Sequence, residues 1–131
     1  MTNVFTYGSL MYPEVFRPVA LANPQCLRAR LDGWSRHAIR ARTYPAAVPA
    51  TGAGIEGVLW MGLDEDAMTR LDRFEGDEYE RQQVLVTLPG GDRVDAQVYR
   101  WLDVTSLLPG DWSSDDFERH HLLDFFRVHG T

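Results

Sequence analysis

One acidic side chain, Glu75, falls on the apolar side of a predicted helix. An α-helix turns about 100° per residue, so Met68, Leu71 and Glu75, at positions i, i+3 and i+7, share one face. Burial on that face and the negative end of the helix dipole would both raise the pKa of a carboxyl group towards neutrality. Such a group can act as a general base. Two other interpretations stay open: Glu75 reaches water from a frayed helix end, or it pairs with Arg81.

A second stretch, Val4–Leu10, could bind a ligand through its backbone. Val4–Tyr7 alternates β-branched and aromatic residues, which favours a short buried strand. Gly8 then permits a tight turn into Ser9, or the close approach of another group. Successive N–H groups in such a turn can converge on a carboxylate or on a developing oxyanion. The alternative interpretation is an ordinary strand end.

Other reactive residues lack the partners that their chemistry requires. His120 and His121 are adjacent, so they face different ways and lack the i, i+4 spacing of helical zinc ligands. Ser9 lacks the G-x-S-x-G elbow of a nucleophilic serine, although a distant histidine could still fold near it. The single cysteine, Cys26, excludes an intrachain disulfide and is interpreted as an inert thiol. His37 is interpreted as a structural histidine on a strand.

Composition indicates one globular domain spanning residues 1–131. The net charge of −6 argues against a nucleic-acid partner, which requires a clustered basic surface. Arginines do crowd one region, and we interpret them mainly as solvated strand faces: Arg28, Arg30, Arg36, Arg40 and Arg42. Neither a signal-peptide pattern nor an apolar run of membrane-spanning length is present, so we expect a soluble cytoplasmic protein that does not associate with membranes.

The periodicities predict an α+β fold with several strands. Asp64 is a suitable N-cap for a helix that runs to about Glu75 and stops at Gly76. The turn residues 89–92 (Pro-Gly-Gly-Asp) join two alternating stretches into a hairpin. A further helix is expected from Ser113 to Gly130. The expected strands are Val4–Tyr7, Leu27–Arg42 with a break at Gly33, Ile55–Met61 as a central strand, Tyr79–Leu88 and Arg93–Leu102.

Prolines and glycines predict irregular structure elsewhere. Pro13 and Pro18 limit the segment from Tyr12 to Asn23 to short helical turns. Tyr44–Pro49 is expected to be a stiff extended loop, and Thr51–Gly54 a turn. A small, partly closed barrel with flanking helices would accommodate this order of elements.

Taken together, the motifs resemble the γ-glutamylcyclotransferase-like superfamily, and most closely its small AIG2-like, γ-glutamylamine-cyclotransferase-type members. Neither of the two principal motifs is specific alone, but both at this separation make the resemblance strong. The matching stretches, in the family's order, are Phe5-Thr6-Tyr7-Gly8-Ser9-Leu10, Tyr44-Pro45, Ile55-Glu56-Gly57-Val58-Leu59-Trp60, Leu71-Asp72-Arg73-Phe74-Glu75-Gly76, Tyr79-Glu80-Arg81 and Ala96-Gln97-Val98-Tyr99.

The resemblance implies a compact mixed β-barrel with peripheral helices and a cavity at one end. It also implies that Glu75 is the catalytic residue and that no cofactor or metal is used. The implied substrate is a small γ-glutamyl amide, which is cyclised to 5-oxoproline with release of an amine or amino acid. The implied substrate-binding residues are Tyr7, Gly8, Ser9, Leu10 and Tyr79. The competing hypothesis is a binding module that keeps the cavity without turnover.

Overall fold

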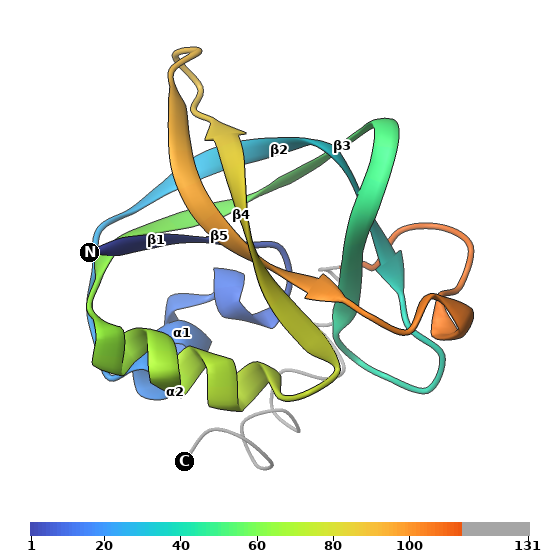
Figure 1. Ribbon diagram of the computed structural model, residues 1–131, viewed down its shortest axis with the longest axis horizontal. Coiled ribbons are helices and arrows are strands. Elements are labelled where there is room, and N and C mark those ends of the chain that lie inside the picture. The colour runs from blue at the N-terminus through green and yellow to red at the C-terminus, as the bar shows by residue number, and fades with distance from the viewer. Residues whose placement is uncertain (114–131) are drawn as a thin grey trace.

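The computed structural model describes residues 1–113, and in this range the strands close into one barrel in the order β1-β3-β2-β4-β5 (Figure 1). The strands are β1 (Thr2–Thr6), β2 (Cys26–Ala38), β3 (Pro45–Leu63), β4 (Tyr79–Thr87) and β5 (Arg93–Trp101). Helices α1 (Pro13–Ala20) and α2 (Glu65–Glu75) lie together below the barrel in this view. Two short 3-10 helices are η1 (Ser9–Met11) and η2 (Val104–Ser106). The predicted α+β barrel with peripheral helices is confirmed.

The sheet is mixed because β1 pairs with two different partners. β1 runs antiparallel to β3 and parallel to β5, where Val4 is opposite Gln97. β3 lies between β1 and β2, as expected for a strand with apolar residues on both faces. The antiparallel pairing of β2 with β4 closes the barrel, and Arg30 is opposite Thr87 in this pair.

β3 corrects the prediction for the middle of the chain. We expected a loop over Tyr44–Pro49 and a turn over Thr51–Gly54, but strand structure continues from Pro45 to Leu63. The reason is tertiary: β2 pairs with both halves of β3, and that long-range ladder outweighs the local preference of proline and glycine. The irregularity survives as a shift in register, where residues 50–53 of β3 stand opposite Gly33, which has φ of +82°.

Helix α1 is longer than the prolines suggested. Pro13 occupies the first helical turn, where a missing N–H has no cost, and the helix continues through Pro18 to Ala20. Packing compensates for the backbone bond that Pro18 cannot make, because Phe16 stacks on Trp60 with ring centroids 4.1 Å apart. α1 thereby covers one outer face of β3.

The predicted second helix and hairpin are confirmed. Asp64 accepts a hydrogen bond of 2.8 Å from the Ala67 N–H, and α2 ends at Gly76, whose N–H donates to the Asp72 carbonyl. β4 and β5 pair along their whole length, from Tyr79 opposite Trp101 onwards. The helix predicted from Ser113 to Gly130 lies outside the described residues.

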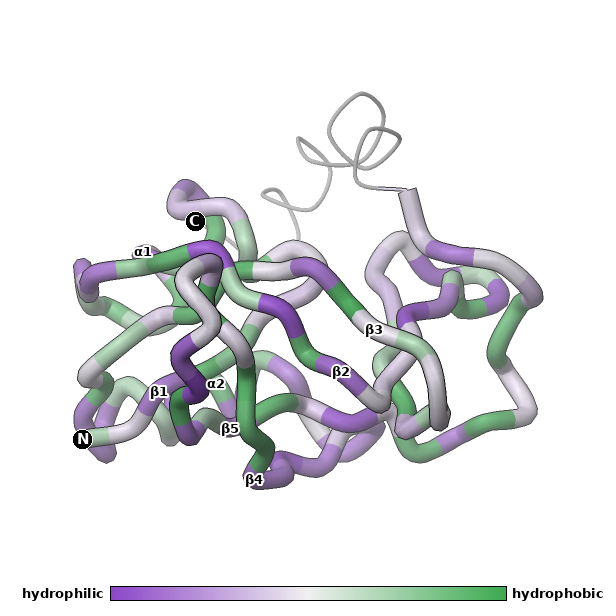
Figure 2. Tube along the Cα trace, turned by 90° about the horizontal axis from the view of Figure 1, so that it is seen from above, coloured by the Kyte–Doolittle hydropathy of each residue, from purple (hydrophilic) through white to green (hydrophobic). Residues whose placement is uncertain are grey.

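Three hydrophobic clusters hold the described elements together, and the smallest comprises Ile39, Ala46 and Trp101. The barrel interior receives buried side chains from each of the five strands of the described range: Phe5, Leu31, Ile55, Leu59, Val86 and Val98. A second cluster fills the space between barrel and helices: Val4, Phe16, Trp60, Leu63 and Leu71. Figure 2 shows the corresponding alternation of hydrophobic and hydrophilic residues along β2. No helix in residues 1–113 is long and apolar enough to cross a membrane.

Candidate active site

A small pocket of about 80 Å³ lies where the end of β1, the start of β3 and the end of α2 meet. All six of the residues that the sequence suggested for the site line this pocket. The structure therefore brings Glu75 and the Tyr7–Leu10 turn together across 65 residues of sequence. The lining is Phe5, Thr6, Tyr7, Gly8, Ser9, Leu10, Tyr44, Pro45, Phe74, Glu75, Tyr79 and Tyr99.

The turn after β1 is the start of a 3-10 helix. Its first backbone bonds run from the Met11 N–H to the Gly8 carbonyl (3.0 Å) and from the Tyr12 N–H to the Ser9 carbonyl (3.2 Å). The preceding N–H groups, those of Gly8, Ser9 and Leu10, have no acceptor in the described part of the chain. This is the expected state of a helix start, and it leaves donors for an anionic group in the pocket.

Position 8 requires glycine because the ring of Pro45 lies close to its Cα atom. A Cβ atom placed on Gly8 would lie 2.6 Å from Cδ of Pro45, the first residue of β3. Such contacts do not occur between real side-chain atoms, so any larger residue must displace either the turn or Pro45. The glycine thus lets the turn lie against the start of β3.

Two side chains outside the pocket lining hold the backbone of the turn. The Trp60 indole Nε1 donates to the Leu10 carbonyl at 3.0 Å, and Arg36 Nη1 donates to the Tyr7 carbonyl at 2.8 Å. Ser9 is buried, and its hydroxyl forms no hydrogen bond within residues 1–113. The backbone of the turn is therefore fixed by hydrogen bonds at both ends.

Glu75 is the last residue of α2 and continues the buried face formed by Ala67, Met68 and Leu71. Its side chain is partly exposed because it faces the pocket. Burial, and next the negative charge of Asp72, raise the pKa of Glu75 from 4.5 to about 8. Arg81 pairs with Asp72 at 3.4 Å, and Glu75 has no ion pair among the described residues. The alternative in which Glu75 pairs with Arg81 is therefore wrong.

Three of the four tyrosines in the lining form neutral polar walls through their hydroxyl groups. Tyr79 donates its hydroxyl to the Pro45 carbonyl at 2.8 Å, and Tyr7 donates to the Tyr99 carbonyl. Tyr99 in turn donates to Asp72 at 2.6 Å. Burial raises the pKa of each hydroxyl, and the charge of Glu75 raises it further. The hydroxyls therefore stay protonated at neutral pH and act as donors.

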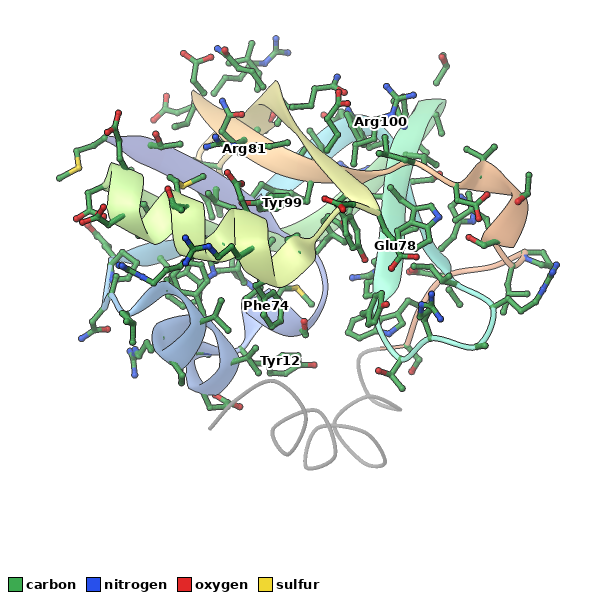
Figure 3. All side chains as sticks on the ribbon, turned by 60° about the horizontal axis from the view of Figure 1, so that its bottom comes forward. Tyr12, Phe74, Glu78, Arg81, Tyr99 and Arg100 are labelled. Atoms are coloured by element: carbon green, nitrogen blue, oxygen red, sulfur yellow. The ribbon has the colours of Figure 1, made fainter. Side chains whose placement is uncertain are left out.

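Figure 3 shows how these residues surround α2. Tyr99 and Arg81 lie on one side of the helix, and Phe74 and Tyr12 lie on the other. Glu78 follows the helix, near the start of β4. Glu75 follows Phe74 as the last residue of α2 and lines the pocket.

Tyr99 and Arg36 contact the residues of the site, but neither was predicted to belong to it. Tyr99 is buried on the face of β5 opposite Ala96 and Val98, and an aromatic residue on that second face was the available signal. Arg36 was interpreted as part of a solvated strand face, which is wrong, because its side chain is only 17% exposed and partnered. Its partners are distant in sequence, so no local pattern could reveal them.

The pocket is poor in charge. Glu75 is the one carboxylate and no lysine, arginine or histidine occurs in its described lining. No group of three or more potential metal ligands occurs anywhere in residues 1–113. In the described lining, Glu75 can transfer protons, and N–H and O–H groups can donate hydrogen bonds.

Comparison with protein-family models gives a match over residues 4–114 to the family described as "Gamma-glutamyl cyclotransferase, AIG2-like". The AIG2-like protein D of Arabidopsis thaliana is 34% identical over 131 residues, covering 98% of this chain and 86% of that protein.

Solved structures of other proteins share this barrel fold. A solution structure of an Arabidopsis thaliana protein superposes with a TM-score of 0.75 at 30% identity, covering 97% of this chain and 87% of the other. A structure named γ-glutamyl cyclotransferase gives a TM-score of 0.64 at 21% identity, covering 77% of this chain and 66% of the other. At that identity the second likeness shows the fold alone.

Proposed function

This chain belongs to the AIG2-like γ-glutamyl cyclotransferase family, and from that premise we propose that it converts a γ-glutamyl amide into 5-oxoproline and a free amine or amino acid. The observation that carries the proposal is the pairing in one pocket of Glu75, whose pKa is about 8, with the free N–H groups of Gly8, Ser9 and Leu10. The reaction needs two parts: a base, and hydrogen-bond donors that stabilise an anionic group.

In the proposed reaction the α-amine of the substrate attacks its own γ-carbonyl carbon. The new N–C bond closes the five-membered lactam, and the bond from that carbon to the leaving nitrogen breaks. The attacking nitrogen begins as an ammonium with three protons and ends with one, so two protons move to the leaving nitrogen. Glu75 accepts these protons and returns them, which a pKa near neutrality allows in both directions.

The Gly8–Leu10 turn would bind the α-carboxylate of the substrate, or the carbonyl oxygen as negative charge develops on it. Tyr79, with its hydroxyl held by Pro45, would form one wall against the γ-glutamyl chain. Because both reacting groups belong to one molecule, holding the chain folded back on itself supplies much of the rate enhancement. No step requires a cofactor.

The test is a screen of γ-glutamyl amides with 5-oxoproline release followed by mass spectrometry. Wild-type protein should form 5-oxoproline from at least one of them, and Glu75→Gln should reduce the rate by about 10²–10⁴-fold, the usual contribution of a general base. Binding of γ-glutamyl amides without product would favour the binding module. Near-normal turnover in Glu75→Gln would remove Glu75 from the catalytic role.

A further inference from the structure

Arg36 on β2 contacts the Tyr7–Leu10 turn, although it is not part of the pocket lining. Its Nη1 donates to the Tyr7 carbonyl at 2.8 Å. Its Nε and Nη2 donate to the two carboxylate oxygens of Asp111 at 2.7 and 3.0 Å. The guanidinium also lies 5.4 Å from the ring centre of Trp112. Every edge of the fork is thus used, and the side chain is held in one orientation.

The Tyr7 carbonyl and the Gly8 N–H belong to one peptide unit. Residues 1–113 contain no cis peptide bond, and in a planar trans unit the C=O and N–H point in opposite directions. A donor that fixes the carbonyl therefore fixes the N–H as well. Arg36 lies on the carbonyl side, so the Gly8 N–H points away from it. Gly8 lines the pocket, and Arg36 is not part of that lining.

Building on the cyclotransferase activity proposed above, we propose that Arg36 is a positioning residue that aims and polarises the Gly8 N–H towards the substrate anion. A cation bound to the carbonyl oxygen draws electron density across the peptide unit, which makes the N–H a stronger donor. The site thereby gains the influence of a positive charge without a basic side chain in the pocket. Asp111 pairs with the other edge of the guanidinium, but its carboxylate is largely exposed to solvent, whereas Arg36 is mostly buried.

The arrangement explains why arginine, and not lysine, occupies this position. A guanidinium can donate to Asp111 and to Tyr7 at once because its donors form a planar fork. An ammonium of similar reach can satisfy one of these partners well and the other poorly. Trp112 also helps to hold Arg36 in place, because its ring lies against the guanidinium. The ring is itself held by a hydrogen bond of 2.7 Å from its indole Nε1 to the Thr43 carbonyl.

The experiment compares wild type with Arg36→Met, Arg36→Lys and the control Arg30→Met. Arg30 also lies on β2 and pairs with Asp32 and Glu56, but it is exposed and does not contact the turn. Two readouts are needed: kcat and KM on a γ-glutamyl amide that the wild type cyclises, and the Gly8 amide resonance in ¹H–¹⁵N spectra. Thermal melting shows that each variant is folded at the assay temperature.

Arg36→Met should lower kcat/KM by about 10- to 100-fold, as expected for loss of a hydrogen bond to a charged group. The Gly8 resonance should shift in the same variant, Arg36→Lys should recover part of both effects, and Arg30→Met should change neither. A rise in KM with unchanged kcat would mean that the turn binds the substrate carboxylate. A fall in kcat would mean that the turn binds the developing oxyanion.

Wild-type kcat/KM and an unshifted Gly8 resonance in Arg36→Met would overturn the inference. If Arg36→Met does not fold, an Arg36→Lys variant with normal kinetics and an unshifted resonance would overturn it equally. If the wild type cyclises no γ-glutamyl amide, the proposed function fails by itself. The Gly8 resonance then decides alone whether Arg36 positions this N–H.

Discussion

Tyr99 donates its hydroxyl to Asp72 at 2.6 Å, one helical turn before Glu75 on α2. Arg81 approaches the other carboxylate oxygen of Asp72 at 3.4 Å. Asp72 is therefore fixed in place by two donors from neighbouring strands. Its negative charge is the second cause, after burial, of the raised pKa of Glu75. This relationship links the barrel to the ionisation of the proposed base.

Asp72→Asn should move the acid limb of the pH–rate profile to lower pH. The limb reports deprotonation of Glu75, so activity should rise as pH rises towards about 8 in the wild type. Removing the neighbouring negative charge lowers the pKa of Glu75, while the amide can still accept the hydrogen bond from Tyr99. The measurement is kcat/KM from pH 5 to 9.

Asp66→Asn provides the matched control, because it removes the same charge from the first turn of α2, away from the pocket. Its profile should coincide with that of the wild type. An unchanged acid limb in Asp72→Asn would mean that burial alone sets the pKa of Glu75.

Gly8→Ala should abolish most activity in a protein that still folds. The new Cβ would meet Pro45 at 2.6 Å, so the turn or the start of β3 must move and the N–H donors lose their alignment. Misplaced groups of this kind cost about 10²-fold in rate. Gly90→Ala is the control, because nothing lies within 4 Å of a Cβ built at Gly90. Equal activity of the two variants would contradict the role given to the turn.

Ser9→Ala should keep most of the wild-type activity. The proposed contribution of Ser9 is its backbone N–H, which alanine retains, and its hydroxyl makes no hydrogen bond within the described residues. The expected change in kcat/KM is less than about tenfold. Complete loss of turnover with an unchanged melting temperature would instead indicate a nucleophilic serine.

Elements with local signals could be predicted from the sequence. The cap at Asp64, the stop at Gly76 and the apolar stripe between them define α2, and with it the position of Glu75. Alternation and a Pro-Gly-Gly-Asp turn likewise define the hairpin of β4 and β5. The proposed base could therefore be found without any knowledge of the fold.

Features that depend on distant partners could not be predicted. Pro45 and Pro49 lie in β3 only because β2 pairs alongside them. Arg36 resembles any solvated strand arginine until Asp111, 75 residues later, is brought against it. Such contacts are decided by tertiary packing, and a single sequence carries no local trace of them.

Glu75→Gln should stabilise the protein, and the gain should grow with pH. The pKa of Glu75 is raised from 4.5 to about 8 on folding, so between these values the folded state binds more protons than the unfolded state. Wild-type stability therefore falls as pH rises through this window, and the loss is complete above about pH 8. Glutamine does not titrate. We expect a gain of roughly 1–2 kcal/mol at pH 8.5, discounted for contact with pocket water, or about 3–10 °C in Tm.

Thermal melting of wild type and Glu75→Gln at pH 5 and pH 8.5 tests whether the variant is the more stable protein at high pH. The two curves should nearly coincide at pH 5, where Glu75 is protonated and resembles the amide, and separate at pH 8.5. Glu65→Gln, a charge removal in the exposed first turn of α2, should leave the difference between the two pH values as in the wild type. A Glu75→Gln variant that melts below the wild type at pH 8.5 would mean that an ionised Glu75 stabilises the fold. In that case Glu75 would not be the desolvated, unpaired carboxyl group on which the proposed proton transfer depends.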